Sequence, residues 1–203
     1  MVDEKEIKGI VEECIEKVVE DFEACPYMFY TEQDIHCYLY SLLLNEKVFK
    51  EAYSMNGKKT LLVHKEYPTT KIYVRDDEGN LNGLTKERYE KQNKRGARGK
   101  FDIAIFKPDD VNIFNFKDKD KTENPVKPFI AIELALDYDE KHLENNLEKL
   151  KENGVKHGYI LHFMRDRNLS KKKYNALKEK IEEIRNEGKI EIYYIKIDQC
   201  VKC

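Results

Sequence analysis

The sequence lacks the features of a membrane, secreted or disulfide-bonded protein. No apolar stretch approaches the length needed to cross a bilayer, and the charged N-terminus does not resemble a signal peptide. The five cysteines are odd in number and scattered, which argues against a disulfide framework. Cys200 and Cys203 have the spacing of half a zinc site, but no second pair accompanies them. We therefore expect a cytoplasmic protein.

An excess of charge of one sign is also missing. The 37 Lys and Arg residues nearly balance the 39 Asp and Glu residues, which leaves a formal net charge of -2. This balance does not indicate a nucleic-acid-binding protein, so any electrostatic footprint must be local. No internal repeat is present, and the apolar fraction is ordinary. We expect a single domain over 1–203.

Helical periodicity is clear in four segments. Apolar residues at helical spacing predict helices over 3–23, 31–45, 139–152 and 170–186. Thr31 is a good N-cap for the second of these, with Asp34 three residues later as in a capping box. The first helix could pack on this chain or on a second copy of it.

Short apolar runs bounded by charged or proline-containing segments predict strands over 61–67, 101–106, 129–136, 158–164 and 190–197. Pro68 is expected to end the first strand. Alternation places Phe101 on one face of its strand with Ile103 and Ile105. The order of elements predicts an α/β fold, in which a mixed central β-sheet is flanked by helices and includes a parallel strand–helix–strand unit.

Two acidic residues interrupt these apolar strands. An uncompensated carboxylate inside a strand that is buried on both faces costs several kcal/mol. Asp102 shares a strand face with Ala104, and Glu133 shares one with Ala131 and Ala135. Such small neighbours leave room above the sheet for a ligand, a metal or a packed helix.

Each acid taken singly could be paired with a helix lysine or could cap a neighbouring helix. Two acids on the small-residue faces of two central strands favour a shared site instead. If the strands are adjacent, both carboxylates can converge on one point, as a hard divalent cation requires. The sequence thus predicts a metal site at Asp102 and Glu133.

The ordered set of segments around these acids resembles the PD-(D/E)XK nuclease superfamily. The segments are Thr31-Glu32-Gln33-Asp34, His64-Lys65-Glu66-Tyr67-Pro68, Arg98-Gly99-Lys100-Phe101-Asp102-Ile103-Ala104-Ile105, Ala131-Ile132-Glu133-Leu134-Ala135, Asn146-Leu147-Glu148-Lys149-Leu150 and Gly158-Tyr159-Ile160.

This resemblance implies a restriction-endonuclease-like core (α-β-β-β-α-β) over 31–164. Residues 1–24 would then be an N-terminal helical extension, and 165–203 a C-terminal helix and strand. Asp102 and Glu133 match the metal-binding, catalytic acids of the family, and Glu32 matches an acid that some members place on the first core helix.

This chain departs from the E-x-K element of the family, because Ala135 stands where the lysine is expected. Lys100 projects from the same strand face as Asp102 and is the neatest replacement, although it could also pair with Asp102 or lie in solvent. Lys141 and Lys149, on the following helix, are the alternatives.

Several further side chains are candidates for the cleft. Glu66 and His64 share a strand face and could reach it, or could line a sheet edge. The remaining histidines are expected to be ordinary core or surface residues: His36, His142, His157 and His162.

Segment 75–100 is either a basic loop or an inserted hairpin. Its basic residues include Lys94, Arg95 and Arg98, which could contact a phosphate backbone or form a solvated charged loop.

Two functions are consistent with these features. The first is a Mg²⁺- or Mn²⁺-dependent nuclease that hydrolyses phosphodiester bonds in DNA rather than RNA. The second is a catalytically inactive nuclease-like module that binds nucleic acid or a protein partner, as the missing lysine suggests. A homodimer stays open, because nucleases that cut both strands are often dimers.

Overall fold

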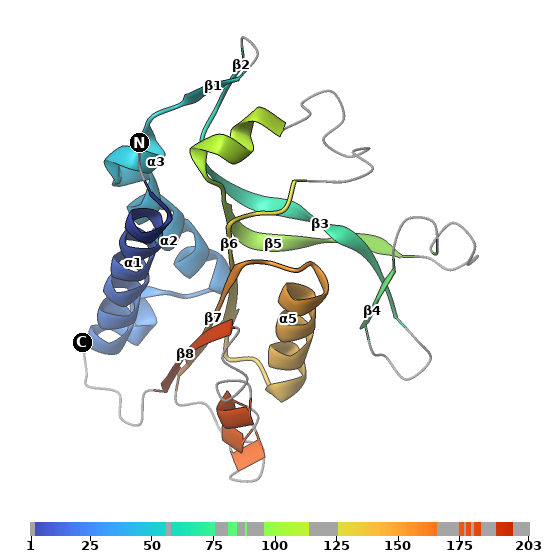
Figure 1. Cartoon of the computed structure of the whole chain (residues 1–203). Helices are drawn as coiled ribbons and strands as arrows, with labels where there is room; N and C mark the ends of the chain where they lie inside the picture. The colour runs from blue at the N-terminus through green and yellow to red at the C-terminus, as the bar shows by residue number, and fades with distance from the viewer. Residues whose placement is uncertain are drawn as a thin grey trace.

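The computed structural model describes residues 3–55, 58–75, 81–84, 96–113, 126–165 and 190–196, together with Arg88 and parts of 175–183. Its centre is a six-stranded mixed sheet with helices on both faces (Figure 1). The predicted α/β architecture is confirmed at this level. No helix in the described part of the chain is long and apolar enough to span a membrane.

The helices are α1 (Glu4–Ala24), α2 (Glu32–Asn45), α3 (Lys47–Lys50) and α5 (Glu140–Glu152), with 3-10 turns η1 (Pro26–Met28) and η2 (Pro108–Ile113). The strands are β1 (Tyr53–Met55), β2 (Lys58–Thr60), β3 (Val63–Arg75), β4 (Leu81–Leu84), β5 (Ala97–Ile105), β6 (Ile130–Leu136), β7 (His157–Met164) and β8 (Ile190–Lys196).

The large sheet has the order β4-β3-β5-β6-β7-β8, and β1 and β2 form a separate hairpin. The pairs from β4 to β6 are antiparallel, whereas β6, β7 and β8 run parallel. The predicted parallel strand–helix–strand unit is therefore β6-α5-β7.

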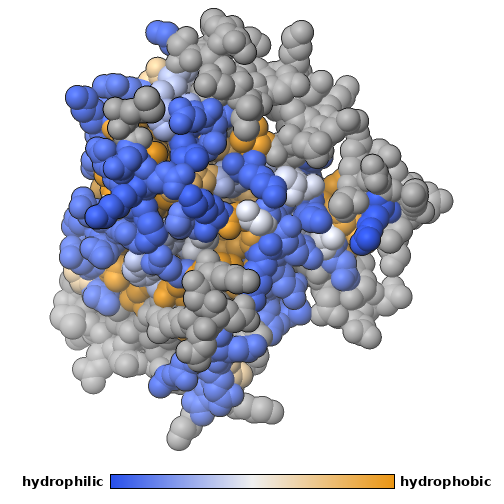
Figure 2. All heavy atoms as spheres, in the orientation of Figure 1, coloured by the Kyte–Doolittle hydropathy of each residue, from blue (hydrophilic) through white to orange (hydrophobic). Residues whose placement is uncertain are grey.

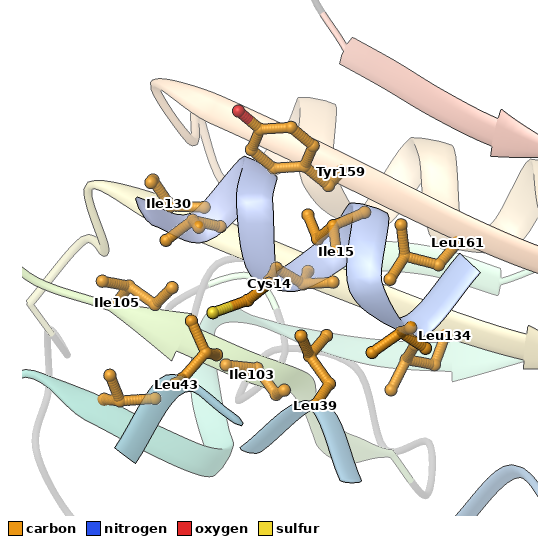
Figure 3. Close-up of a cluster of buried hydrophobic side chains, with 14 of the residues drawn as sticks. Cys14, Ile15, Leu39, Leu43, Ile103, Ile105, Ile130, Leu134, Tyr159 and Leu161 are labelled. Carbon is orange, nitrogen blue, oxygen red and sulfur yellow. The ribbon is translucent and has the colours of Figure 1, made fainter. Parts of the chain in front are cut away.

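The first hydrophobic core lies between one face of the sheet and helices α1 and α2. Ile15 of α1 and Leu39 of α2 face sheet residues such as Ile103 and Leu134 (Figure 3). The side of the molecule that carries α1 and α2 is mostly hydrophilic on its outer surface (Figure 2). Amphipathic helices thus cover this face, and α1 packs on its own chain.

The opposite face of the sheet is covered by α5, whose Leu143, Leu147 and Leu150 pack against the small residues Ala104 and Ala131. This is the face on which the sequence places both acids. The alternation predicted for β6 is confirmed, because Ile130, Ile132, Leu134 and Leu136 belong to the first core.

Phe101 departs from the predicted alternation. It packs with Ala104 and Phe106 in the second core, and not with Ile103 and Ile105 in the first. The β5–β6 ladder ends at Ile103, so the preceding part of β5 is not held to its register by β6.

The expected strand end at Pro68 is wrong, since β3 continues to Arg75 and Pro68 is in register with Lys100 of β5. At Pro68 the other side of β3 carries no partner strand within the described residues, because β4 joins only from Ile72 onward. A proline, which lacks an N–H, is tolerated at such an edge.

The β3–β4 pairing supports the hairpin alternative for part of 75–100. Helix α3 and the β1–β2 hairpin were not predicted. They are too short for their periodicity to stand out in the sequence.

Candidate functional site

The two predicted acids lie where β5 and β6 separate. Three consecutive pairs join these strands, and the last of them is Ile103 with Ile132. Asp102 and Glu133 are the next residues on either strand. The Asp102 carboxylate accepts a hydrogen bond from the Leu134 amide, with Oδ2 2.7 Å from the nitrogen. A side chain therefore satisfies a backbone group that the sheet ladder leaves open.

Asp102 is partly buried, and Glu133 is fully buried. Glu133 is 0 % exposed, and burial raises its pKa against the opposing attraction of Lys149. Burial also raises the pKa of Asp102, again opposed by Lys149. Asp102 also raises the pKa of Glu133, and Lys149 lowers the pKa of both acids, so the two carboxyl groups lie in one electrostatic environment.

Lys149 of α5 is the amine that reaches these acids. Its Nζ is 2.5 Å from Glu133 Oε2 and 3.0 Å from the carbonyl oxygen of Lys100. Burial alone would lower the pKa of Lys149, but the Glu133 and Asp102 carboxylates outweigh burial and raise it. The side chain is therefore a fixed ammonium group at neutral pH.

Lys100 does not occupy the position first expected of it. Its Nζ lies 3.4 Å from Glu66 Oε2, and both side chains are more than half exposed. Lys141 pairs with Glu144 at 3.6 Å on the same helix. Of the three lysines considered as replacements, Lys149 is the one paired with a buried acid, because α5 crosses the small-residue face of β6.

Glu32 enters the same region from α2. It is the first residue of a helix whose Thr31 and Asp34 form the predicted capping box. Burial raises the pKa of Glu32 to about 7, and repulsion by Asp102 adds to this, while a backbone hydrogen bond from Leu136 opposes it. The capped helix end thus holds a third acid near the first two.

His36, expected to be an ordinary histidine, contacts the site directly. Its Nε2 donates to the carbonyl oxygen of Asp102 at 2.6 Å. Burial lowers the pKa of His36. The signal that could have identified it is its spacing, since residues four apart on a helix share a face and Glu32 precedes His36 by four.

Glu66 and His64 have different surroundings, although both belong to β3. Glu66 has a positive φ of 50° and raises the pKa of both Asp102 and Glu32, so its charge acts at the site. His64 Nε2 instead lies 2.9 Å from the Leu61 carbonyl oxygen, and its ring packs against Tyr67 and Phe106.

Of the proposed nucleic-acid-binding residues, Arg98 is described. It is in β5, and its Nη1 donates to the Thr69 carbonyl oxygen at 3.4 Å. Lys94 and Arg95 lie outside the described residues, as do Cys200 and Cys203.

The donor chemistry of the site fits a hard divalent cation. Glu32 Oε2 and Glu133 Oε1 are buried oxygens without a hydrogen-bond partner among the described residues. Carboxylate oxygens are the ligands that Mg²⁺ and Mn²⁺ prefer. Within that same part of the chain, no group of three or more His, Cys, Asp or Glu side chains is already arranged to hold a metal ion. Lys149 holds the second oxygen of Glu133.

Comparison of the chain with protein-family models, curated proteins and solved structures gives no match. Any assignment of function therefore depends on the geometry of this site.

Proposed function

We propose that this chain is a Mg²⁺- or Mn²⁺-dependent nuclease that hydrolyses phosphodiester bonds in DNA, built on a restriction-endonuclease-like core of the PD-(D/E)XK type. The observation that carries the proposal is the group formed by Asp102, Glu133 and Lys149, in which the Lys149 ammonium pairs with the fully buried Glu133 and also attracts the Asp102 carboxylate on the adjacent strand.

The arrangement of elements supports the same proposal. A capped helix, α2, precedes the antiparallel strands β3, β5 and β6, and α5 then leads into β7, which is parallel to β6. Leaving out the short elements, this is the order α-β-β-β-α-β that the resemblance implies.

In this proposal Asp102, Glu133 and Glu32 hold the divalent ion through carboxylate oxygens. A bound divalent ion polarises a phosphate oxygen and lowers the pKa of a coordinated water. Glu32 Oε2 and Glu133 Oε1, which have no hydrogen-bond partner in the described part of the chain, are the available ligands, and the Leu134 amide keeps the Asp102 carboxylate oriented.

Lys149 takes the role of the family's E-x-K lysine, whose position is occupied by Ala135 in this chain. Because its ammonium stays protonated at neutral pH, it acts as a positive charge toward the phosphate and does not remove a proton from water. Its contact with the Lys100 carbonyl oxygen fixes the amine between α5 and β5.

A catalytically inactive nuclease-like module is the second candidate. The observation that favours it is the close pairing of Lys149 with Glu133, which compensates the buried carboxylate without any ion. On that proposal the acids would not gain stability from a divalent metal.

Cleavage of supercoiled plasmid in the presence of Mn²⁺ tests the two candidates. The nuclease converts plasmid to the nicked form, and Asp102→Asn abolishes nicking while its amide oxygen can still accept from Leu134. Asp110 lies in η2 and accepts a hydrogen bond from the Lys107 backbone amide. Asp110→Asn is the matched control and keeps activity. The nuclease proposal is refuted if the plasmid stays supercoiled with the unsubstituted protein and both variants. It is also refuted if Asp102→Asn nicks the plasmid as fast as the unsubstituted protein.

A further inference from the structure

The most exposed large apolar side chains lie on the chain segments that precede Glu32 and follow β6. Among the described residues these are Tyr27 (48 %), Met28 (53 %), Tyr30 (81 %) and Tyr138 (43 %). Tyr30 precedes Glu32 by two residues, and Tyr138 follows β6, the strand that carries Glu133. The two chain segments also meet, since Leu136 makes a backbone hydrogen bond to Glu32.

A buried arginine holds these segments together. Arg165, at the end of β7, pairs with Asp137 through Nη2 and Oδ2 at 2.6 Å. The same guanidinium donates to the Phe29 carbonyl oxygen at 2.9 Å and to that of Tyr30 at 3.4 Å. Asp137 has a positive φ of 61°, an uncommon conformation for a residue other than glycine that the pairing with Arg165 helps to maintain. The backbone that presents Tyr30 and Tyr138 is thus fixed.

The ring of Tyr138 is also held in place. It stacks on the His142 imidazole with ring centroids 4.0 Å apart and an interplanar angle of 11°. His142 is in the first turn of α5, and burial lowers its pKa. One face of the tyrosine ring is therefore covered by a fixed partner, while the side chain as a whole stays 43 % exposed.

We propose that Tyr30 and Tyr138 stack on unpaired bases and make this site selective for single-stranded DNA. This inference rests on the proposed nuclease function, since it places the bases of a strand beside the acids that would act on its phosphodiester bond. In a duplex the faces of the bases are covered by their neighbours, so an aromatic ring can stack only on bases that are unpaired or splayed out.

The chemistry of this rim favours a nucleic acid strand over other occupants. Flat tyrosine rings held on a fixed backbone offer the base stacking that single strands use. Continuity with the acid site is direct, because Tyr30 and Glu32 are separated by Thr31 alone. A protein partner on the same tyrosines is the alternative that the experiment has to exclude.

Fluorescence anisotropy tests the proposal with a labelled oligothymidylate of about 20 nucleotides, alone or annealed to its complement. EDTA is present, so that cleavage does not affect the measurement. We expect the single strand to bind more tightly than the duplex. Tyr30→Ala and Tyr138→Ala should each weaken single-strand binding roughly 5- to 100-fold and leave duplex binding unchanged.

The matched controls are Tyr30→Phe and Tyr138→Phe, which keep the ring and should keep binding. Equal affinity for both forms of DNA, or alanine variants that bind like the unsubstituted protein, overturns the proposal. So does sedimentation that shows Tyr30→Ala dissociating an oligomer while DNA binding is unchanged.

Plasmid cleavage is scored separately from oligonucleotide binding. If the protein nicks plasmid but its binding to the single strand does not depend on the two tyrosines, the stacking proposal alone is refuted. Tyrosine-dependent binding without nicking refutes the nuclease and leaves the stacking surface established.

Discussion

At the scale of single residues, the pair Lys149–Glu133 is the feature that most needs a functional explanation. Burying two charges costs more in desolvation than a single contact usually returns, and apolar residues of similar size often stabilise a fold as well or better. Breaking such a pair from one side is nevertheless costly, because the other charge is left buried. Stability alone therefore gives no reason for a sequence to place this pair between α5 and β6.

Removing the amine should affect both stability and activity. We expect Lys149→Met to lower the free energy of unfolding by about 3 kcal/mol, because Glu133 loses its ion-pair partner inside the protein. Nicking should fall at least about 100-fold, the effect typical of losing one electrostatic contact in a catalytic site. Urea denaturation and plasmid cleavage measure the two effects.

Two controls separate the roles of this lysine. Lys151→Met changes an exposed lysine on the same helix and should leave both quantities near their original values. The double variant Lys149→Met with Glu133→Gln should regain stability without regaining cleavage. Unchanged stability in the single variant would mean that the two charges are not paired in solution.

Glu32 makes a prediction about pH. Its folded-state pKa of about 7 lies above the ordinary value of 4.5, because burial disfavours the charged form. Between these values the folded state binds more protons than the unfolded state, so the free energy of unfolding falls as pH rises. The raised pKa of Glu133 acts in the same direction.

The metal-free protein should therefore be less stable at about pH 8 than at about pH 5, and Glu32→Gln should reduce the difference by about 1–2 kcal/mol. Urea denaturation in EDTA at both pH values measures this. Glu23→Gln, at an exposed position in α1, is the control and should keep the full difference. An identical pH dependence in Glu32→Gln and the unsubstituted protein contradicts the burial of Glu32.

At the scale of elements, the sequence predicts those whose own residues determine them. Helix α2 is bounded by its capping box, and α5 by Asp139 at its start and Asn153-Gly154 at its end, and all of these are local signals. Strand β3 was truncated at Pro68 because the tolerance for this proline depends on the neighbours of β3 in the sheet, which a local pattern does not contain.

The candidate site likewise combines features that a local sequence pattern determines with features that depend on how helices cross the sheet. The face of Glu133 follows from alternation along β6, whereas its pairing with Lys149 of α5 was one of several alternatives that the sequence left open. The choice of Lys149 over Lys100 depends on how α5 crosses the sheet, and the contact of His36 depends on how α2 approaches β5. Neither crossing is encoded in a short segment, so the sequence could offer only alternatives.

The N-terminus of α2 allows a test at this scale. The Thr31 hydroxyl accepts from the Asp34 amide at 3.3 Å, and Asp34 Oδ2 accepts from the Thr31 amide at 2.7 Å. We expect Thr31→Ala to lower the free energy of unfolding by about 1 kcal/mol and to lower nicking, because Glu32 is the first residue of the helix that loses its cap. Urea denaturation and plasmid cleavage report the two changes.

Thr31→Ser keeps a hydroxyl at the cap and should behave like the unsubstituted protein. If Thr31→Ala loses stability but cleaves at the original rate, the cap does not position Glu32, and Glu32 is not needed for the reaction.

At the scale of the whole molecule, the site depends on both layers of helices. Glu32 and His36 come from α2 on one face of the sheet, Lys149 comes from α5 on the other, and Asp102 and Glu133 come from the strands between them. The contacts lie around the point where β5 and β6 separate: His36 binds the Asp102 carbonyl oxygen, the Leu134 amide binds the Asp102 carboxylate, and Lys149 binds Glu133.

Helix α1 contributes to this arrangement through the core and not through the site. Ile15 has no exposed surface and packs among residues of α2 and the sheet (Figure 3). Replacing a buried isoleucine by alanine removes apolar contacts and leaves a cavity, which costs about 2–5 kcal/mol. Ile15→Ala should therefore destabilise the whole domain, since the same core supports α2 and β5.

Activity per folded molecule should not change in Ile15→Ala, because no group of the site is altered. Urea denaturation gives the loss of stability, and nicking well below the unfolding midpoint gives the activity. Ile10→Ala, at a partly buried position on the same helix, should cost less. Equal losses for the two variants would mean that α1 does not pack on the sheet as the structure has it. A loss of cleavage by fully folded Ile15→Ala would mean that α1 acts on the site itself.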